Sequence, residues 1–393
     1  SRYSAMSFVI ILVISSCANY TQNIDTLDVL DSSVREESTQ INVVTNFTSH
    51  PPIATGDSTT CVILNDKNIS CWGYNSYGKL GNGSLESYSS NPVKVLGLPD
   101  NDGAVQVEVG SDVACTVLES GRLFCWGRGG YVGDGTYEDR SIAIEVLTND
   151  NDVMVSKVVI GSSHACALIS NGSVMCWGQE YEGKLGDGVE RGTWDVANTP
   201  NYTAPLPDGR LAVDIGVSTS STCAVLDNGS ISCWGFAHYT LFGNEGIANQ
   251  PNTGFSFGED ITVMSITTYG GDESGFMSGM CFILSNDTIS CFRGSGFLKE
   301  SYSFSPHTPV MVAIGAKHAC ALLSDNSLRC WGDNKFGQIG DGTWESKGDP
   351  IHIQGFDNQD PIISISAGSA ITCAVTSSGK VYCWGSNLSL IHI

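Results

Sequence analysis

Two cysteines ten residues apart enclose the stretch that decides the fold, Cys115-Thr-Val-Leu-Glu-Ser-Gly-Arg-Leu-Phe-Cys125. Two short β-rich runs flank Glu119-Ser120-Gly121, which predicts a hairpin with a three-residue loop. The third residue of such a loop is left-handed, and glycine tolerates that conformation best. Folding about the loop places the two cysteines opposite each other, with Cα atoms roughly 4.5–5.5 Å apart, which is within disulfide range.

This hairpin recurs along the chain. Fourteen of the 15 cysteines form pairs with the same spacing, and we expect seven disulfides: Cys61–Cys71, Cys115–Cys125, Cys166–Cys176, Cys223–Cys233, Cys281–Cys291, Cys320–Cys330 and Cys373–Cys383. The positions equivalent to Gly121 are Gly172, Gly229, Gly379, Asn326, Asp287 and Lys67. Only the lysine is a poor choice for a left-handed residue. First cysteines lie 39 to 58 residues apart (320−281 and 281−223), a period typical of propellers or solenoids.

Each repeat contains enough β-forming segments for four strands. Trp-Gly follows the second cysteine in six repeats, and we expect these tryptophans to pack between neighbouring sheets. A glycine-rich segment such as 78–83 comes next, then a β-branched stretch, then a strand before the next cysteine pair. Four strands are the content of a propeller blade, so we predict an all-β, seven-bladed propeller of four-stranded antiparallel blades with one hairpin disulfide per blade.

Three stretches show the repeat pattern in most detail: Gly161-Ser-Ser-His-Ala-Cys-Ala-Leu168, Asn171-Gly-Ser-Val-Met-Cys-Trp-Gly178 and Gly315-Ala-Lys-His-Ala-Cys-Ala-Leu322. They resemble repeats of the regulator of chromosome condensation family, which forms seven-bladed propellers. The paired cysteines look like an extracellular branch of the family, similar to repeats of crinkly-type plant receptor kinases and exported bacterial proteins. The resemblance implies protein binding on one propeller face.

The fifth repeat departs from this pattern. It has Phe292 where the others have tryptophan, and it lacks the glycine-rich segment after Cys291. Two interpretations are open, a decayed blade and a loop rebuilt for a partner.

The N-terminal region indicates export. The apolar run Phe8 to Ile14 is too short to span a bilayer and resembles the core of a signal peptide, which we assign to residues 1–17. Small residues before Cys17 resemble a bacterial lipobox, in which that cysteine is lipidated; the alternative is a signal peptide cleaved after Ala18. We expect an extracellular or cell-surface protein, with an outer-membrane lipoprotein as the bacterial form. Whether the chain is bacterial or eukaryotic stays open.

The remaining domain boundaries follow from composition. Residues 18–50 are polar and are expected to form a tether, 51–387 the propeller and 388–393 a tail. The last repeat ends without its fourth strand. Because 41–47 is the β-rich stretch upstream of the repeats, we predict that it pairs with the seventh blade.

Charge excludes one class of partner. Acidic residues outnumber basic ones 41 to 19, giving a net charge of −22, which repels phosphate backbones and anionic lipids. We therefore expect no nucleic-acid binding, and membrane attachment only through the lipid anchor at Cys17. A monomer is expected.

No motif of a hydrolase, zinc protease or nucleotide-binding loop is present in the sequence, so we predict that the chain is not an enzyme and has no metal or cofactor. His164 and His318 occupy the same repeat position and are interpreted as structural hydrogen-bonding residues. Aspartates of the Gly-Asp-Gly turns, such as Asp134 and Asp341, are interpreted as turn residues.

The leading functional hypothesis is a non-catalytic propeller that presents loops to an unidentified protein partner. The alternatives are an inhibitor of a secreted enzyme and an adhesion or envelope structural protein. The inhibitor hypothesis predicts exposed aromatic side chains on one rim. The candidates lie beside the glycine-rich segments: Tyr77, Tyr131, Tyr181 and Phe336.

Overall fold

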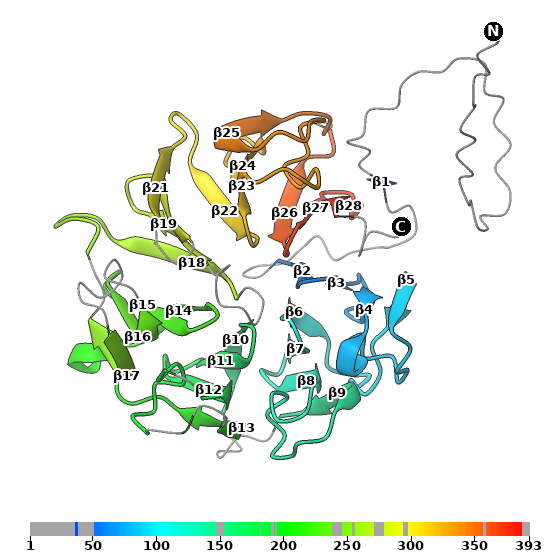
Figure 1. Cartoon of the computed structure of the whole chain (residues 1–393), viewed down its shortest axis with the longest axis vertical. Coiled ribbons are helices and arrows are strands. Elements are labelled where there is room, and N and C mark those ends of the chain that lie inside the picture. Colours follow the sequence, from blue (N-terminus) through cyan, green and yellow to red (C-terminus); the bar gives the residue numbers. More distant parts are fainter. Residues whose placement is uncertain are drawn as a thin grey trace, which may run out of the picture. The chain divides into compact units, whose positions relative to one another are not determined.

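The computed structural model describes residues 36–37, 51–146, 153–180, 182–189, 192, 195–237, 246–253, 256–270, 279–293, 298–356 and 359–386. These residues form seven four-stranded antiparallel sheets, which surround a common centre as the blades of a propeller (Figure 1). The predicted fold class is confirmed. Helix among the described residues is confined to two short 3-10 turns, η1 (Ser76–Gly78) and η2 (Pro207–Gly209).

Each blade has four strands, which follow one another from the centre outward. Blade 1 consists of β2 (Ile53–Thr55), β3 (Thr59–Ile63), β4 (Ile69–Tyr74) and β5 (Tyr88–Lys94), and blade 2 of β6 (Ala104–Val109), β7 (Val113–Leu118), β8 (Leu123–Gly127) and β9 (Arg140–Glu145). Blade 3 consists of β10 (Val155–Ile160), β11 (His164–Ile169), β12 (Val174–Gln179) and β13 (Val196–Tyr202), and blade 4 of β14 (Ala212–Val217), β15 (Ser221–Leu226), β16 (Ile231–Ala237) and β17 (Gly246–Thr253). Blade 5 consists of β18 (Val263–Tyr269), β19 (Gly279–Leu284), β20 (Thr288–Arg293) and β21 (Leu298–Ser303), and blade 6 of β22 (Pro309–Ile314), β23 (His318–Leu323), β24 (Leu328–Gly332) and β25 (Lys347–Ile353). Blade 7 consists of β26 (Ile362–Ala367), β27 (Ile371–Thr376), β28 (Val381–Gly385) and β1 (Glu36–Glu37).

All seven predicted disulfides are present, each joining the second and third strands of one blade. Cys166 lies directly opposite Cys176, and the other pairs have the same register. The Cα atoms of the pairs are 4.0–4.1 Å apart, closer than expected. Opposite residues of an antiparallel pair alternate between hydrogen-bonded and non-hydrogen-bonded positions, and the second kind brings the two Cα atoms closer. In blade 3, Ile169 N–H donates to Ser173 O three residues from Cys166, an odd number, so Cys166 and Cys176 occupy a non-hydrogen-bonded position.

The predicted loop geometry is also confirmed. All seven third-loop residues have positive φ, from 61° at Lys67 to 84° at Gly172. A β-carbon added at Gly121 would lie 3.0 Å from the β-carbon of Met154 in the next blade. In blade 1 the large and small residues exchange places. The loop residue is Lys67, the facing residue of the next blade is Gly103, and the lysine stem fills the space that a β-carbon at Gly103 would occupy.

The ring closes between blades 7 and 1. The outer strand of blade 7 is β1, in which Glu36 pairs with Cys383 and Glu37 with Tyr382. The predicted closing segment 41–47 lies outside the described residues, so that prediction stays untested. At the centre, Thr55 N–H donates to Ser366 Oγ over 3.0 Å, which links β2 to β26.

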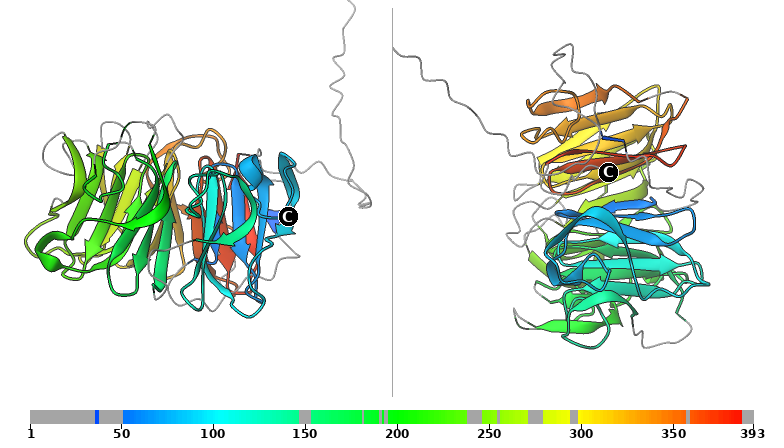
Figure 2. Two further views of the ribbon diagram at one scale, coloured as in Figure 1. Left: turned by 90° about the horizontal axis from the view of Figure 1, so that it is seen from below. Right: turned by 90° about the vertical axis from the view of Figure 1, so that its right-hand side faces the viewer.

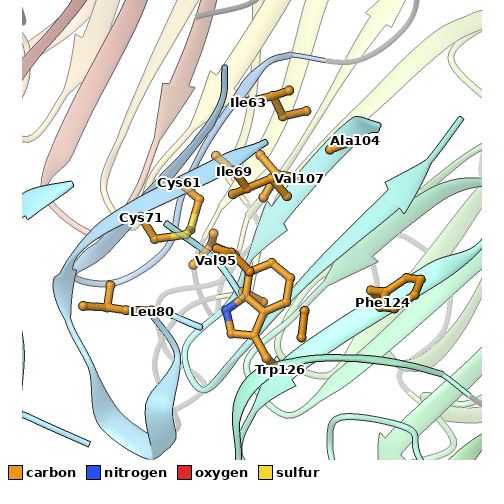
Figure 3. Close-up of a cluster of buried hydrophobic side chains, with 14 of the residues drawn as sticks. Cys61, Ile63, Ile69, Cys71, Leu80, Val95, Ala104, Val107, Phe124 and Trp126 are labelled. Atoms are coloured by element: carbon orange, nitrogen blue, oxygen red, sulfur yellow. A yellow bond between two sulfur atoms is a disulfide. The ribbon is translucent and has the colours of Figure 1, made fainter. Parts of the chain in front are cut away.

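Apolar side chains fill the space between blades. The six repeat tryptophans are at most 3% exposed, which confirms their place in the core. Trp126 of blade 2 packs with Leu80 and Val95 of blade 1 beside the Cys61–Cys71 disulfide (Figure 3). In blade 5 the sheet is complete and Phe292, 1% exposed, occupies the tryptophan position, so the interpretation of a decayed blade is wrong for the sheet itself.

The chain divides into residues 1–31 and a unit from 32 to 393, and every described residue belongs to the second unit. Within the described residues, no helix has the length and apolar character needed to cross a membrane.

Candidate functional site

Two faces of the ring carry the loops, as the side views in Figure 2 show. We call one the turn face, because it carries the turns between second and third strands and the connections between blades. The other is the glycine face, which carries the turns between first and second strands and the glycine-rich connections between third and fourth strands. This division follows from the antiparallel order of the strands within each blade.

Two of the predicted aromatic residues meet on the glycine face. The guanidinium carbon of Arg128 lies 5.2 Å from the ring centre of Tyr77 and 4.8 Å from that of Tyr131. Both distances are within the range of a cation–π interaction. Nη1 of Arg128 donates to Asp112 Oδ2 over 2.8 Å, which holds the guanidinium between the rings. We call Tyr77, Arg128 and Tyr131 the arginine patch.

The patch joins blades 1 and 2 and is accessible. Tyr77 is 39% exposed, while Tyr131 and Arg128 are partly buried. Burial lowers the pKa of Arg128, but the hydrogen bond to Asp112 and the nearby tyrosines outweigh this effect and raise the pKa above its ordinary value. The arginine is therefore a fixed cation. Sequence reasoning found the tyrosines but missed Arg128, whose signal is a cation directly after a repeat Trp-Gly.

The other two predicted aromatic residues do not join this patch. Phe336 is 51% exposed but belongs to blade 6, where its N–H bonds to Gln338 Oε1 over 2.9 Å. Tyr181 lies outside the described residues. Cys17, the predicted lipidation site, also lies outside them.

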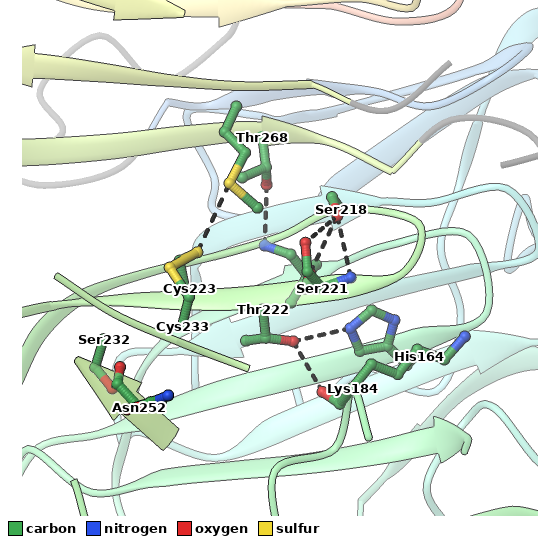
Figure 4. Close-up of a disulfide and its surroundings, with 12 residues drawn as sticks. His164, Lys184, Ser218, Ser221, Thr222, Cys223, Ser232, Cys233, Asn252 and Thr268 are labelled. Carbon is green, nitrogen blue, oxygen red and sulfur yellow. Dashed lines mark hydrogen bonds between the residues drawn. A yellow bond between two sulfur atoms is a disulfide. The ribbon is translucent and has the colours of Figure 1, made fainter. Parts of the chain in front are cut away.

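A buried polar network joins blades 3 and 4 beneath the glycine face (Figure 4). Nε2 of His164 is 3.0 Å from Thr222 Oγ1, and the threonine hydroxyl donates to Lys184 O over 3.0 Å. Because the hydroxyl has one proton, the imidazole donates from Nε2. Lys184 Nζ donates to Ser163 Oγ over 2.8 Å.

The network is structural at neutral pH. Burial lowers the pKa of His164 well below its ordinary value, and the Lys184 charge adds to this effect. Burial also lowers the pKa of Lys184 to about 8, although Glu180 and Glu182 oppose the shift. His318 and Thr372 repeat the contact between blades 6 and 7, at 2.7 Å. The predicted structural role of both histidines is confirmed.

The first strands of the blades surround a central cavity of about 590 Å³. Six of these strands contain a β-bulge at their second residue, where pairing with the second strand shifts. The bulged residues lie at the turn-face end of the cavity: Val105, Ser156, Val213, Met264, Val310 and Ile363. Four of them, Ser156, Val213, Met264 and Val310, line the cavity itself.

Charged groups lie deeper in the cavity. Lys157 Nζ donates to Asp214 Oδ1 over 2.5 Å and to Ile215 O over 3.0 Å, which joins blades 3 and 4. Glu108 of blade 2 lines the same wall but accepts no hydrogen bond from any described residue. Burial raises the pKa of Glu108 to about 7, although the Lys157 charge opposes the shift.

The glycine-face end of the cavity is narrow. The Tyr269 hydroxyl of blade 5 donates to Asp57 Oδ1 of blade 1 over 2.6 Å, a bond between two non-adjacent blades. A β-carbon added at Gly368 would lie 2.1 Å from Gly56 O, so the backbones of blades 7 and 1 touch there. At the turn-face end, Val213, Met264 and Val310 line the cavity and are each more than half exposed, so we call this end the mouth.

Comparison with known proteins supports the repeat assignment. The regulator of chromosome condensation (RCC1) repeat matches residues 53–79, 155–184, 311–338 and 362–389, and a second description of the same repeat matches 70–117 and 325–375. The match is to the repeat as a whole, so the extracellular cysteine-paired branch stays a prediction.

Several known proteins are similar to this chain over most of its length. The ultraviolet-B receptor UVR8 of Arabidopsis thaliana is 25% identical over 353 residues, which cover 85% of this chain and 76% of the receptor. Human WBSCR16 has 18% identity and a TM-score of 0.67, with 87% of this chain and 88% of that chain covered. Prp20p of Saccharomyces cerevisiae, studied for its binding to Gsp1p and histones, has 17% identity and a TM-score of 0.67, with 85% and 82% covered. At these identities the two structures establish the fold alone.

Proposed function

Because the chain carries regulator of chromosome condensation (RCC1) repeats on a seven-bladed propeller, we propose that it is an exported, non-catalytic protein-interaction module. The observation that supports this role is the arginine patch. Tyrosine and arginine are the residue types enriched in the energetic centres of protein interfaces. On this propeller they are held together on an accessible face.

The patch is preorganised. Asp112 fixes Arg128, and the two tyrosines belong to connections that pack on blades braced by disulfides. A partner that binds this surface therefore spends little free energy on ordering side chains. The structural similarity to Prp20p, whose study names protein partners, is consistent with such a role.

The cysteine chemistry supports the proposal of export. Fourteen cysteines form seven disulfides, in which every cysteine but the partly buried Cys383 is buried, and such disulfides persist in oxidising compartments. We propose a signal peptide in residues 1–17, lipid attachment at Cys17, and a monomeric propeller at the cell surface. Protease added to intact cells should remove the propeller, and a Cys17→Ser variant should be released into the medium. Protection from the protease would contradict a surface location.

The binding role is tested on the full chain at its native surface. A crosslinking experiment should capture a partner in a fixed ratio to the wild-type chain. Arg128→Ala should reduce capture at least about tenfold, since truncating an interface centre costs more than about 1.4 kcal/mol. Trp344→Ala is the matched control, because Trp344 is 55% exposed and belongs to blade 6, away from the patch between blades 1 and 2. Equal capture by Arg128→Ala and the wild type, with both folded, would overturn the proposed site.

An inhibitor of a secreted enzyme is the second candidate, favoured by the clustering of Tyr77 and Tyr131 around Arg128. In that case the captured partner is an enzyme whose activity falls in proportion to added propeller. An enzyme that stays fully active in the complex would contradict inhibition and leave the interaction role in place.

A further inference from the structure

Five of the six bulged residues on the turn face are apolar, the sixth being Ser156, and we call these five the apolar ring. Val213, Met264 and Val310 come from three consecutive blades and are 56%, 62% and 58% exposed. Val105 is 38% exposed and Ile363 is partly buried. A β-bulge redirects a side chain that regular pairing would place elsewhere, and in this propeller it does so at one position in six blades. Apolar side chains gathered at the mouth of a cavity are typical of a binding site.

Below the ring, the cavity wall has an excess of negative charge. Its charged residues are Asp57, Glu108, Lys157 and Asp214. The single lysine of this set is paired with Asp214, and Asp57 accepts the Tyr269 hydroxyl. Glu108 is left without a cationic hydrogen-bond donor among the described residues, in a place where burial disfavours its ionised form. A cation that entered the cavity would compensate this carboxylate.

The loops of the turn face carry an excess of acidic residues as well. Lys67 and Arg210 of the turn face are paired with Glu119 and Asp227. Seven further acidic residues of this face form no ion pair within the described part of the chain: Asp66, Asp100, Asp102, Asp208, Glu259, Asp260 and Asp287. Such an acidic face attracts a positively charged partner and accelerates its association.

We propose that the turn-face mouth binds a protein segment in which a lysine is flanked by apolar residues. The lysine enters the cavity and its ammonium group pairs with Glu108, while the flanking side chains pack on Val213, Met264 and Val310. A lysine suits this path because its four-carbon stem is apolar and its charge is at the tip. This inference rests on the proposed role in protein interaction, but it concerns a different face from the arginine patch.

The test uses the full chain and a defined probe, the peptide acetyl-Leu-Lys-Leu-amide, in isothermal titration calorimetry. We expect binding with a Kd on the order of 1 mM, the range of a short ligand that uses few contacts. The peptide with norleucine in place of lysine keeps the stem and lacks the ammonium group, so it should bind at least about tenfold more weakly. Butylammonium lacks the flanking side chains and should also bind more weakly; equal binding would overturn recognition of a protein segment.

Two substitutions locate the peptide in the cavity. Glu108→Gln keeps the shape of the side chain and should weaken binding about tenfold, because the charge-assisted contact is lost. Met264→Ser should weaken it about fivefold through lost apolar contact. Leu85→Ser, at a 74% exposed residue outside the ring, is the control and should bind as the wild type does.

The outcomes separate this inference from the proposed function. If no variant changes binding, or the norleucine peptide binds equally well, the cavity is not a lysine site, whatever the crosslinking result at the arginine patch. If Glu108→Gln weakens the peptide while Arg128→Ala still captures its partner, the lysine site stands and the proposed site on the glycine face falls.

Discussion

Two seams between neighbouring blades place a threonine at the same position, but only one of the two hydroxyl groups is hydrogen-bonded to a described residue. At the seam between blades 6 and 7, Thr372 Oγ1 is 2.7 Å from His318 Nε2 and donates to Gln338 O over 2.8 Å. At the closing seam between blades 7 and 1, Thr60 Oγ1 is buried and has no hydrogen-bond partner among the described residues. The difference lies in the preceding blade and not in the threonine.

Within the described part of blade 7, no side chain or carbonyl forms a hydrogen bond with the Thr60 hydroxyl. Ile371 occupies the position in blade 7 that His318 has in blade 6. It packs with Trp72 of blade 1, the blade that contains Thr60. The carbonyl that accepts from Thr372 belongs to a glycine-rich connection between third and fourth strands, and in blade 7 the fourth strand is β1, which comes from the N-terminal side. Among the described residues, the contacts at the closing seam are apolar packing and the Thr55–Ser366 hydrogen bond near the centre. The repeat keeps its geometry while the chemistry of a seam changes.

The largest expected effect tests what the two seams share. Trp384 and Trp72 are 3% and 1% exposed, and each packs against the preceding blade. Replacing either with alanine should destabilise the propeller by about 3–5 kcal/mol, as for other buried large-to-small changes. Chemical denaturation of both variants measures this. A difference of more than about 2 kcal/mol between them would show that indole packing is not common to the two seams.

The next effect tests what the seams do not share. Thr372→Val keeps the volume but leaves His318 Nε2 without its threonine partner and removes one donor from Gln338 O. We expect a loss of about 2 kcal/mol, the cost of an unsatisfied buried polar group. Denaturation with unchanged m-value gives the number, and Thr262→Val is the control, because Thr262 is exposed and its hydroxyl forms no hydrogen bond with a described residue. If Thr372→Val left the free energy of unfolding unchanged, the hydrogen bonds of Thr372 would not distinguish this seam from the closing seam.

A pH-dependent effect distinguishes the histidine seams from the closing seam. The pKa of His164 is lowered by burial and by the Lys184 charge, so below about pH 6.5 the unfolded chain binds more protons than the folded one. Stability from this residue is fully present above pH 6.5 and is lost progressively as the pH falls below that value. We expect His164→Gln to lose less stability than the wild type between pH 7 and 5, in denaturant titrations at fixed ionic strength.

Glu108 also contributes to the pH dependence of stability, and it does so equally in the wild type and in His164→Gln. The difference between the free energies of unfolding of these two proteins at each pH therefore excludes its contribution. The pKa of that carboxyl is raised to about 7 by burial, so its effect has the opposite sign and destabilises the fold as the pH rises from about 4.5. Parallel pH profiles for wild type and His164→Gln would contradict the role assigned to His164.

The blade hairpins were predictable from the sequence because their rules are local. A spacing of ten residues and a left-handed loop position fix the disulfide without reference to other blades, and this holds even at Lys67. The lysine is accommodated by Gly103, which belongs to the next blade, so the compensation for a poor local choice is visible only in three dimensions.

The cavity mouth and the closing strand were not predictable in the same way. The bulges at Val213, Met264 and Val310 shift a register by one residue within apolar strands, and an apolar run has the same appearance with or without a bulge. The described outer strand of blade 7 is Glu36–Glu37, which has no β-forming residues to mark it. Its pairing is set by the exposed edge of β28, a tertiary feature.

The smallest effect is also the most specific to the comparison. Thr60→Val replaces an unpaired buried hydroxyl with a methyl group of similar size and should stabilise the propeller by about 0.5–1 kcal/mol, since no hydrogen bond is lost and the buried polar group is removed. The same substitution thus has opposite signs at the closing seam and at Thr372. Introducing the missing partner provides the complementary test: with Ile371→His, a hydroxyl at position 60 gains an imidazole neighbour, so Thr60→Val should lose its benefit in that background. Additive free energies of unfolding in this double-mutant cycle would mean that the threonine position does not sense the preceding blade.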